Sequence, residues 1–330
     1  MKKSFLTIVA LGTMLASCSN DETLDVTARE AITFDRVFVE NATRAIDNSY
    51  TSANLSEFEV YGTITNSQNQ TANLFKQELV EYKNNQWVYN SANTQYWIPG
   101  NTYHFTAIAD GNIENVTEVK TDTDGMPTTI ELKDAAHQKD ILYAVSEQIT
   151  YESGVKTVGF TFNHLLAKAK FTVKNEISTN NGYTYQVSDV CITNAYKTAT
   201  YTIGSGWGSQ EESYSHSFGN IAATSIDAST DEDITHIKSG ESVESKYERL
   251  LIPFTNGPIN ISFTSQLYKD NVLIQTKEET ITANNITLAA GNAYNFVIKL
   301  GNPGEPIQFT VTNVNGWETN NNNIDVNVNN

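Results

Sequence analysis

Hydrophobic and polar residues alternate along most of the chain. Segments with this period of two are rich in Thr, Tyr, Val, Ile and Phe, which is typical of β-strands with one buried face. Turn-forming sequences such as Ala290-Gly291-Asn292 separate the segments. The clearest alternations lie at residues 58–64, 103–109, 158–162, 169–173, 259–263 and 293–298. The pattern predicts a nearly all-β protein and favours β-sandwiches.

Two segments depart from this alternation. Residues 134–146, DAAHQKDILYAVS, have a weak helical pattern and fit either a short helix or a loop followed by a strand. Residues 204–233 are rich in glycine, serine and acidic residues. This composition predicts a long excursion between two strands.

The first residues have the pattern of a secretory signal peptide. A basic start, Met1-Lys2-Lys3, precedes a short apolar run that ends in small residues, so residues 1–17 are predicted to be removed. The sequence Leu15-Ala16-Ser17-Cys18 resembles the lipobox of bacterial lipoproteins, whose cysteine receives acyl chains such as palmitate and becomes the new amino terminus. The resemblance implies lipidation at Cys18 and a membrane anchor. An ordinary signal peptide with an incidental cysteine remains the alternative.

Charge and cysteine content restrict the classes of function. The formal net charge is −17 at pH 7. Loss of residues 1–17 would also remove Lys2 and Lys3, which makes the remaining chain more acidic. Such an acidic surface repels nucleic acid, so we expect no nucleic-acid partner. Cys191 is the only cysteine besides Cys18, which leaves no internal disulfide framework. The hydrophobic core therefore has to stabilise the fold.

The chain is predicted to contain two tandem sandwich domains. Residues 18–30 form a polar tether, and the first sandwich covers residues 31–155, beginning with a strand at 31–44. The second sandwich covers residues 156–319. A tail at residues 320–330 contains a short alternation of apolar residues, Ile324, Val326 and Val328.

Several segments, taken in order, resemble the fimbrillin family, the lipoprotein pilins of Bacteroidales. The lipobox is followed by an early strand and by the sequence TRA at residues 43–45. The segment VGFTFNHLLAKAKFTV, residues 158–173, resembles one that recurs in Mfa-like members. Further matching segments are LLIPF at 250–254, LAAGNAYNFVIKL at 288–300 and VNGWE at 314–318. The resemblance covers most of the chain that follows the signal peptide.

This resemblance implies a specific assembly mechanism. Family members fold as two sandwiches of transthyretin-like topology, and an outer-membrane protease cuts after an arginine beyond the first strand. The strand leaves, and a strand from another subunit fills the open groove. The matching cleavage residue is Arg44, with Ala45 as the new amino terminus, whereas Arg36 lies within the alternation of the strand. The residues of the removable strand are Ile32, Phe34, Phe38 and Val39.

The implied function is that of a fimbrial subunit at the cell surface. The partners would be other pilin subunits, the outer membrane through the lipid anchor before processing, and a host or bacterial surface ligand. The candidate donor strand holds only three apolar residues, Ile324, Val326 and Val328. A stalk subunit is expected to donate more, so a tip or accessory subunit whose tail closes its own sheet stays open.

The sequence contains no recognised catalytic or metal-binding motif. The five histidines lack metal-ligand spacing, and His164 is predicted to be a packed or hydrogen-bonding residue. The sequence Asp122-Thr-Asp-Gly125 resembles the start of a calcium loop, but Met126 and Lys133 occupy positions that need oxygen ligands, so we predict a turn. We therefore expect no enzymatic activity, no cofactor and no metal.

Two other hypotheses remain. Trp207 lies in a glycine-rich segment, where an exposed indole ring can contact a ligand. The second hypothesis is accordingly a monomeric surface lipoprotein that binds glycan through Trp207. The third is a surface hydrolase, because two catalytic carboxylates need only converge in space.

Overall fold

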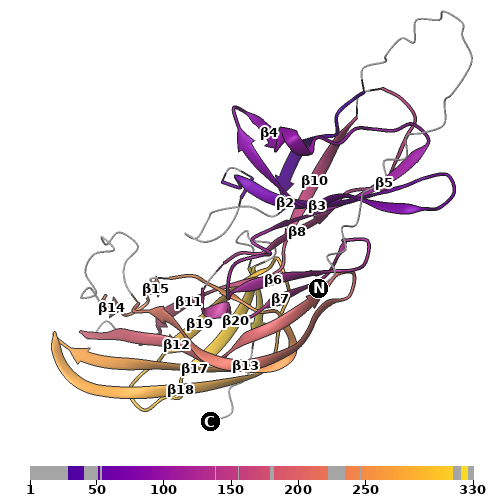
Figure 1. Ribbon diagram of the computed structural model, residues 1–330. Helices are drawn as coiled ribbons and strands as arrows, with labels where there is room; N and C mark the ends of the chain where they lie inside the picture. Colours follow the sequence, from indigo (N-terminus) through magenta and orange to yellow (C-terminus); the bar gives the residue numbers. More distant parts are fainter. Residues whose placement is uncertain are drawn as a thin grey trace, which may run out of the picture.

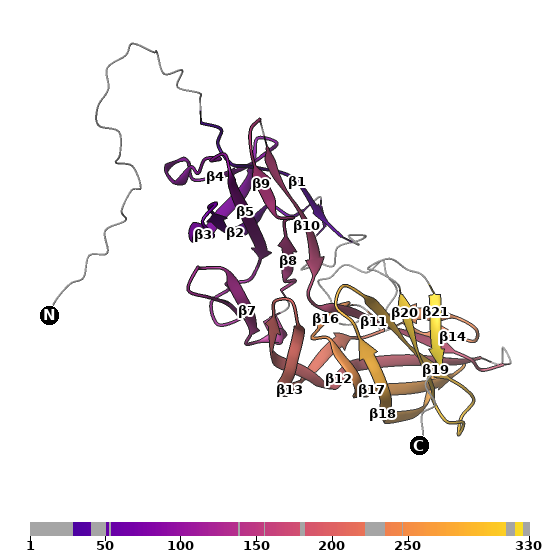
Figure 2. The ribbon, with the colours of Figure 1, turned by 90° about the vertical axis from the view of Figure 1, so that its right-hand side faces the viewer.

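The protein is built almost entirely of β-strands. The structure, a computed structural model, describes residues 29–40, 51–52, 54–137, 139–154, 156–178, 182–221, 235–245, 247–314 and 321–325. Within these ranges the helical elements are two 3-10 turns, η1 (Ser91–Asn93) and η2 (Ala135–His137). In the same ranges, no helix has the length and apolarity to cross a membrane. The predicted all-β fold is confirmed, and the strands gather into two lobes (Figures 1 and 2).

One eight-stranded sheet forms the N-terminal lobe. Its order is β2-β3-β4-β1-β10-β8-β5-β9, and β5 also pairs with β2, so the sheet closes on itself. Six phenylalanines of these strands point inwards and belong to one core cluster: Phe34, Phe58, Phe75, Phe105, Phe160 and Phe162. The strands are β1 (Thr33–Val39), β2 (Glu57–Thr65), β3 (Thr71–Lys83), β4 (Gln86–Tyr89), β5 (Asn101–Ala109), β8 (Leu142–Val145), β9 (Ile149–Tyr151) and β10 (Thr157–His164).

Two sheets pack face to face in the C-terminal lobe. The six-stranded sheet has the order β15-β11-β19-β20-β21, with β16 also on β11, and it contains β11 (Ala167–Asn175), β15 (Ser242–Glu244), β16 (Arg249–Leu251), β19 (Ala293–Leu300), β20 (Gln308–Val314) and β21 (Asn321–Asp325). The seven-stranded sheet has the order β18-β17-β12-β7-β6, with β13 and β14 also on β12, and it contains β6 (Thr117–Thr121), β7 (Pro127–Leu132), β12 (Tyr183–Thr202), β13 (Gly206–Gly219), β14 (Ile237–Lys238), β17 (Phe254–Lys269) and β18 (Val272–Leu288). Phe171 and Phe296 of the first sheet meet Val187 and Ile261 of the second in one core.

The hydrogen bonding of the sheets does not follow the expected boundary near residue 155. β10 begins at Thr157 but pairs with β1 and β8 of the N-terminal lobe. In the opposite sense, the β6–β7 hairpin comes from the first half of the chain, and Leu132 of β7 pairs with Ala199 of β12. Alternation identifies a strand but carries no information about which sheet the strand joins.

An apolar cluster joins the two lobes. It combines side chains of both lobes with those of the β6–β7 hairpin: Tyr61, Ile108, Ile130, Leu132, Leu165, Leu166, Leu250 and Ile252. Beside it, Nδ1 of the buried His164 lies 2.8 Å from Oδ2 of the buried Asp140. The prediction of a packed, hydrogen-bonded His164 is confirmed.

The structure shows which secondary structure the two segments without clear alternation adopt. Residues 134–146 form the 3-10 turn η2 followed by β8, so the loop-and-strand interpretation is confirmed. The long excursion expected at 204–233 is wrong in its first part, because β13 occupies Gly206–Gly219 and pairs along β12. Its alternating side chains Tyr214, His216 and Phe218 pack inwards despite the polar composition around them. Residues 222–234 lie outside the described residues.

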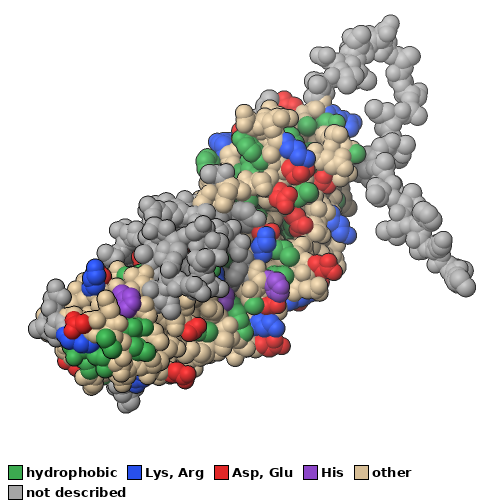
Figure 3. Space-filling model, turned by 90° about the vertical axis from the view of Figure 1, so that its left-hand side faces the viewer, with side chains coloured by type: hydrophobic (Ala, Val, Ile, Leu, Met, Phe, Trp, Pro, Cys, Tyr) green, Lys and Arg blue, Asp and Glu red, His purple; other side chains and the backbone are tan. Residues whose placement is uncertain are grey.

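Charged side chains of both signs are scattered over the face of the molecule in Figure 3, with hydrophobic side chains at the far end of the C-terminal lobe. The exposed hydrophobic residues include Val272, Leu273 and Ile274, which follow the β17–β18 turn. In that turn Asp270 and Asn271 both have positive φ, as a tight hairpin requires.

The interlobe cluster provides a test of the packing. Ile130 is fully buried there, so Ile130→Ala should lower the free energy of unfolding by about 2–5 kcal/mol because it leaves a cavity. Thr128→Ala changes an exposed residue two positions earlier and should cost less than about 1 kcal/mol. Urea denaturation measures both values, and equal losses would contradict the packing described.

His216 should make stability depend on pH. Burial, followed by the nearby Arg249 charge, lowers the pKa of His216 from 6.5 to about 4. Between these two values the unfolded chain holds a proton that the folded chain does not, so stability should fall as pH drops from 6.5 to 4, by up to roughly 3 kcal/mol. His216→Phe should flatten the unfolding free energy across this window relative to the wild type. An unchanged slope would show that other groups cause the dependence.

Candidate functional site: the slot of the first strand

β1 lies between β4 and β10 in the closed sheet. It pairs in parallel with β10, where Phe34 lies opposite Val158 and Val39 opposite Phe162. On its other side it pairs with β4 at a single position, Phe34 with Trp87. Figure 2 shows β1 beside β10 at the top of the lobe. Since β4 reaches β10 only through β1 in this sheet order, removal of β1 opens the sheet.

Backbone hydrogen bonds hold both ends of β1. The amide of Ile32 donates to the carbonyl of Gln95 at 2.8 Å, and the amide of Glu40 donates to the carbonyl of Phe162 at 2.8 Å. The Tyr89 hydroxyl donates to the carbonyl of Ile32 at 2.9 Å. Burial raises the pKa of Tyr89, so this hydroxyl keeps the proton that it donates.

Phe34 occupies the centre of the aromatic core. Its ring centroid lies between 5.7 and 6.4 Å from five other rings, one from each of β2, β3, β4, β5 and β10: Phe58, Phe75, Tyr89, Phe105 and Phe160. Four of these pairs are tilted or edge-on and the pair with Phe160 is stacked, and such pairs add to the stabilisation from burial. Ile32 and Val39 are also buried, so β1 fills the core along its length.

A β-bulge at Arg36 changes which residues of β1 face inwards. Arg36 has φ of 50°, and the register with β10 shifts between Phe34 and Val37. The alternation therefore moves by one residue, and Val39 is buried whereas Phe38 is 54% exposed. Of the four apolar residues expected in the removable strand, Ile32, Phe34 and Val39 face the core and Phe38 does not.

Several residues singled out from the sequence lie outside the described residues. These are Cys18, Arg44, Ala45, Val326 and Val328. The described chain resumes near the end of β1, where the amide of Val39 donates to Oγ of Ser52 at 2.9 Å. Ile324 belongs to β21, which pairs with β20 of its own lobe.

Trp207 lies against the interlobe cluster. Its indole N–H donates to the carbonyl of Leu165 at 2.6 Å, and its ring packs against Tyr201 at 5.5 Å between centroids. The glycines that flank Trp207 suggested exposure, but the side chain is half-buried. This placement does not support Trp207 as an exposed ligand contact.

The calcium-like sequence forms the predicted turn. Oδ1 of Asp122 accepts hydrogen bonds at 2.9 Å from the amides of Asp124 and Met126, between β6 and β7. Across the described ranges, no group of three or more His, Cys, Asp and Glu side chains is arranged to hold a metal ion.

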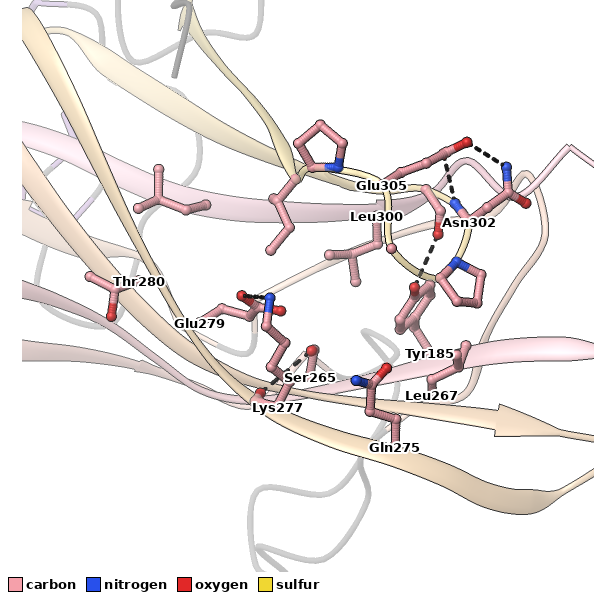
Figure 4. Close-up of a pocket in the computed structure, with 16 residues that line it drawn as sticks. Tyr185, Ser265, Leu267, Gln275, Lys277, Glu279, Thr280, Leu300, Asn302 and Glu305 are labelled. Atoms are coloured by element: carbon pink, nitrogen blue, oxygen red, sulfur yellow. Dashed lines mark hydrogen bonds and ion pairs between the residues drawn. The ribbon is translucent and has the colours of Figure 1, made fainter. Parts of the chain in front are cut away.

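A cavity of about 600 Å³ opens in the C-terminal lobe between β17, β18 and residues 300–307 (Figure 4). Its polar groups bind one another: Nζ of Lys277 lies 2.8 Å from Oε2 of Glu279, and the Tyr185 hydroxyl donates to the carbonyl of Gly301 at 3.0 Å. Sequence reasoning missed this cavity because its walls come from three separate segments, Tyr185 of β12, the β17–β18 hairpin and residues 300–307, and alternation does not show which segments meet.

Comparison with known proteins identifies the family. The sequence matches the model of the fimbrillin-like family over residues 43–317. The chain belongs to the fimbrillin-like family. The resemblance that the sequence motifs indicated is thus confirmed.

Several solved structures are similar to this fimbrillin-like protein, and the first of them, with a TM-score above 0.6, shares its fold. A fimbrial protein from Bacteroides vulgatus matches with a TM-score of 0.63 and 17% identity, covering 87% of this chain and 99% of that one. A putative cell adhesion protein from Bacteroides ovatus matches with a TM-score of 0.48, 14% identity and coverage of 92% and 100%. The fimbrial anchor protein Mfa2 from Porphyromonas gingivalis matches with a TM-score of 0.37, 11% identity and coverage of 89% and 100%. A search of curated proteins finds no match.

The slot of β1 can be tested by truncating its central ring. Phe34→Ala should lower the free energy of unfolding by about 3–5 kcal/mol, because five neighbouring rings lose a partner and a cavity remains. The matched control is Phe38→Ala on the same strand, where the exposed ring should contribute less than about 1 kcal/mol. Guanidinium denaturation of both variants decides the matter, and a larger loss for Phe38→Ala would refute the assignment.

Proposed function

We propose that this fimbrillin-like protein is a structural subunit of a fimbrium, in a stalk, tip or accessory position, that serves adhesion. In this proposal it is exported as a lipoprotein acylated at Cys18 and reaches the outer membrane. A protease then cuts after Arg44, β1 leaves, and a strand of another subunit takes its place.

The position of β1 is the observation that supports the proposal. β1 is held between β4 and β10 by hydrogen bonds and side-chain packing, and Phe34 has the most ring contacts among its buried side chains. Loss of β1 would expose unpaired backbone groups of β10 together with apolar side chains such as Phe160. A donated strand satisfies both kinds of group at once.

The location of Arg44 in the chain adds to this argument. Arg44 follows Val39, the last residue of β1, by five residues and precedes Ser52, which binds the backbone of Val39. A cut after Arg44 would leave Cys18 and β1 on one fragment and every later strand on the other. Processing would therefore free the body of the subunit from its anchor in the same step that opens the slot.

The glycan-binding alternative depended on Trp207. Because the indole of Trp207 donates to Leu165 and packs on Tyr201, no described contact favours that alternative over the fimbrial subunit.

Amino-terminal sequencing tests the processing step. Protein sheared from the surface of cells that produce the full chain should begin at Ala45. Arg44→Ala should keep the acylated Cys18 terminus and remain with the membrane, because the protease lacks its arginine. Arg36→Ala, which changes an arginine inside β1, should be processed like the wild type. Sheared material that begins at Val37, or normal processing of Arg44→Ala, would overturn the proposal.

A further inference from the structure

β1 lies along β10 (Figure 2), but it has one residue more than the part of β10 that it covers. Phe34 and Val39 both have partners on β10, and the register shifts by one residue between them. At this shift, Asp35 and Arg36 together lie opposite Gly159. One of these two residues of β1 is therefore extra.

The extra residue takes a conformation that a regular strand does not need. Arg36 has φ of 50°, in the left-handed region, which is unfavourable for a residue with a Cβ atom. Its amide donates to Oδ1 of the preceding Asp35 at 2.7 Å. A Cβ atom at Gly159 would lie 3.5 Å from the carbonyl oxygens of both residues, so the bulge is packed over the glycine of β10. The bulge therefore costs free energy in the backbone and interrupts the ladder.

The core does not use the extra residue. The register on the two sides of the bulge assigns a partner on β10 to each core-facing residue of the strand: Phe34 to Val158, Val37 to Phe160 and Val39 to Phe162. The partners are spaced two residues apart, as the alternation of a regular strand requires. With Arg36 taken out, Asp35 alone lies opposite Gly159, and the same side chains reach the core through one-to-one pairing.

We propose that β1 is an imperfect occupant of its own slot and that a strand without the extra residue fits better. The partner that the slot fits is an extended segment of another subunit, parallel to β10, with apolar residues at every second position. Its apolar side chains would take the places of Ile32, Phe34, Val37 and Val39. The part that concerns another subunit rests on the proposed function, whereas the fit of β1 is a property of the intact chain.

The covalent link to the lobe lets an imperfect strand keep its place. In the uncut chain β1 is tethered, which gives it a high effective concentration at the slot. A cut after Arg44 would remove this advantage, and β1 would then compete with an incoming strand on fit alone. The strand without a bulge has the lower free energy in the slot, because it avoids the positive φ and pairs without interruption. Exchange would therefore proceed in one direction.

Deletion of Arg36 from the full, uncut chain tests the fit. We expect the equilibrium constant of unfolding to fall by about fivefold or more, because the strained residue is gone and the register is continuous. Arg36→Gly keeps the extra residue. Glycine tolerates the positive φ but adds freedom to the unfolded chain, so this constant should change by less than about twofold.

Deletion of Phe38 is the matched control, since it removes an exposed residue from the same strand. The shortened strand has either Val39 turned outwards or Arg36 turned towards the core. Either arrangement should raise the equilibrium constant of unfolding by about tenfold or more.

Urea denaturation measures the three constants, and hydrogen exchange of the β10 amides measures local opening at the slot. This exchange should slow by about fivefold or more when Arg36 is deleted. A deletion variant that is less stable than the wild type, or that fails to fold, would overturn the proposal. So would an equal gain from Arg36→Gly, because one strained residue rather than the extra length would then be the cause. All variants are compared uncut, so a failure of processing after Arg44 would leave these results unchanged.

Discussion

The parallel pairing of β1 with β10 is the interaction on which the N-terminal lobe depends. The sheet closes because β1 connects β10 to β4, and the core closes because Phe34 meets one aromatic ring from each of five other strands. A closed sheet has no free edge, which protects it against unwanted pairing. The same arrangement makes closure of the sheet and of the core depend on one strand of seven residues, β1.

Side-chain packing and backbone hydrogen bonding contribute differently to holding β1 in place. The side chains of Phe34 and Val39, and of Ile32 just before the strand, are buried in the core. The backbone pairing of β1 is less continuous, because the bulge at Arg36 interrupts the ladder with β10 and β4 contributes one paired position. Apolar burial therefore supplies most of what retains β1. Any strand with apolar residues at matching positions can supply the same burial, which is the physical condition for exchange of one strand for another.

The sequence predicted the strands well but could not predict their partners. Alternation located the segments that form β2, β5, β10, β11, β17 and β19, and the order of motifs indicated the family. Sheet membership depends on long-range pairing, so β10 was placed in the wrong lobe. Phe38 was named among the residues of the removable strand, but the sequence could not show that a bulge at Arg36 turns its side chain towards solvent. Trp207 was expected on the surface because its neighbours are glycines, but the carbonyl that binds it belongs to Leu165, 42 residues away.

β1 and β21 occupy different places in their sheets, and this difference constrains how each can leave. β1 has a neighbour on both sides, so its departure breaks two ladders and opens an aromatic core. β21 pairs with β20 alone among the strands described, and its departure leaves the sheet one strand narrower with its pairing otherwise intact. Release of an edge strand breaks one ladder and so costs less free energy than release of an enclosed strand, which breaks two ladders and exposes a core. If β1 is removed as proposed, an irreversible step such as proteolysis is therefore suited to this removal.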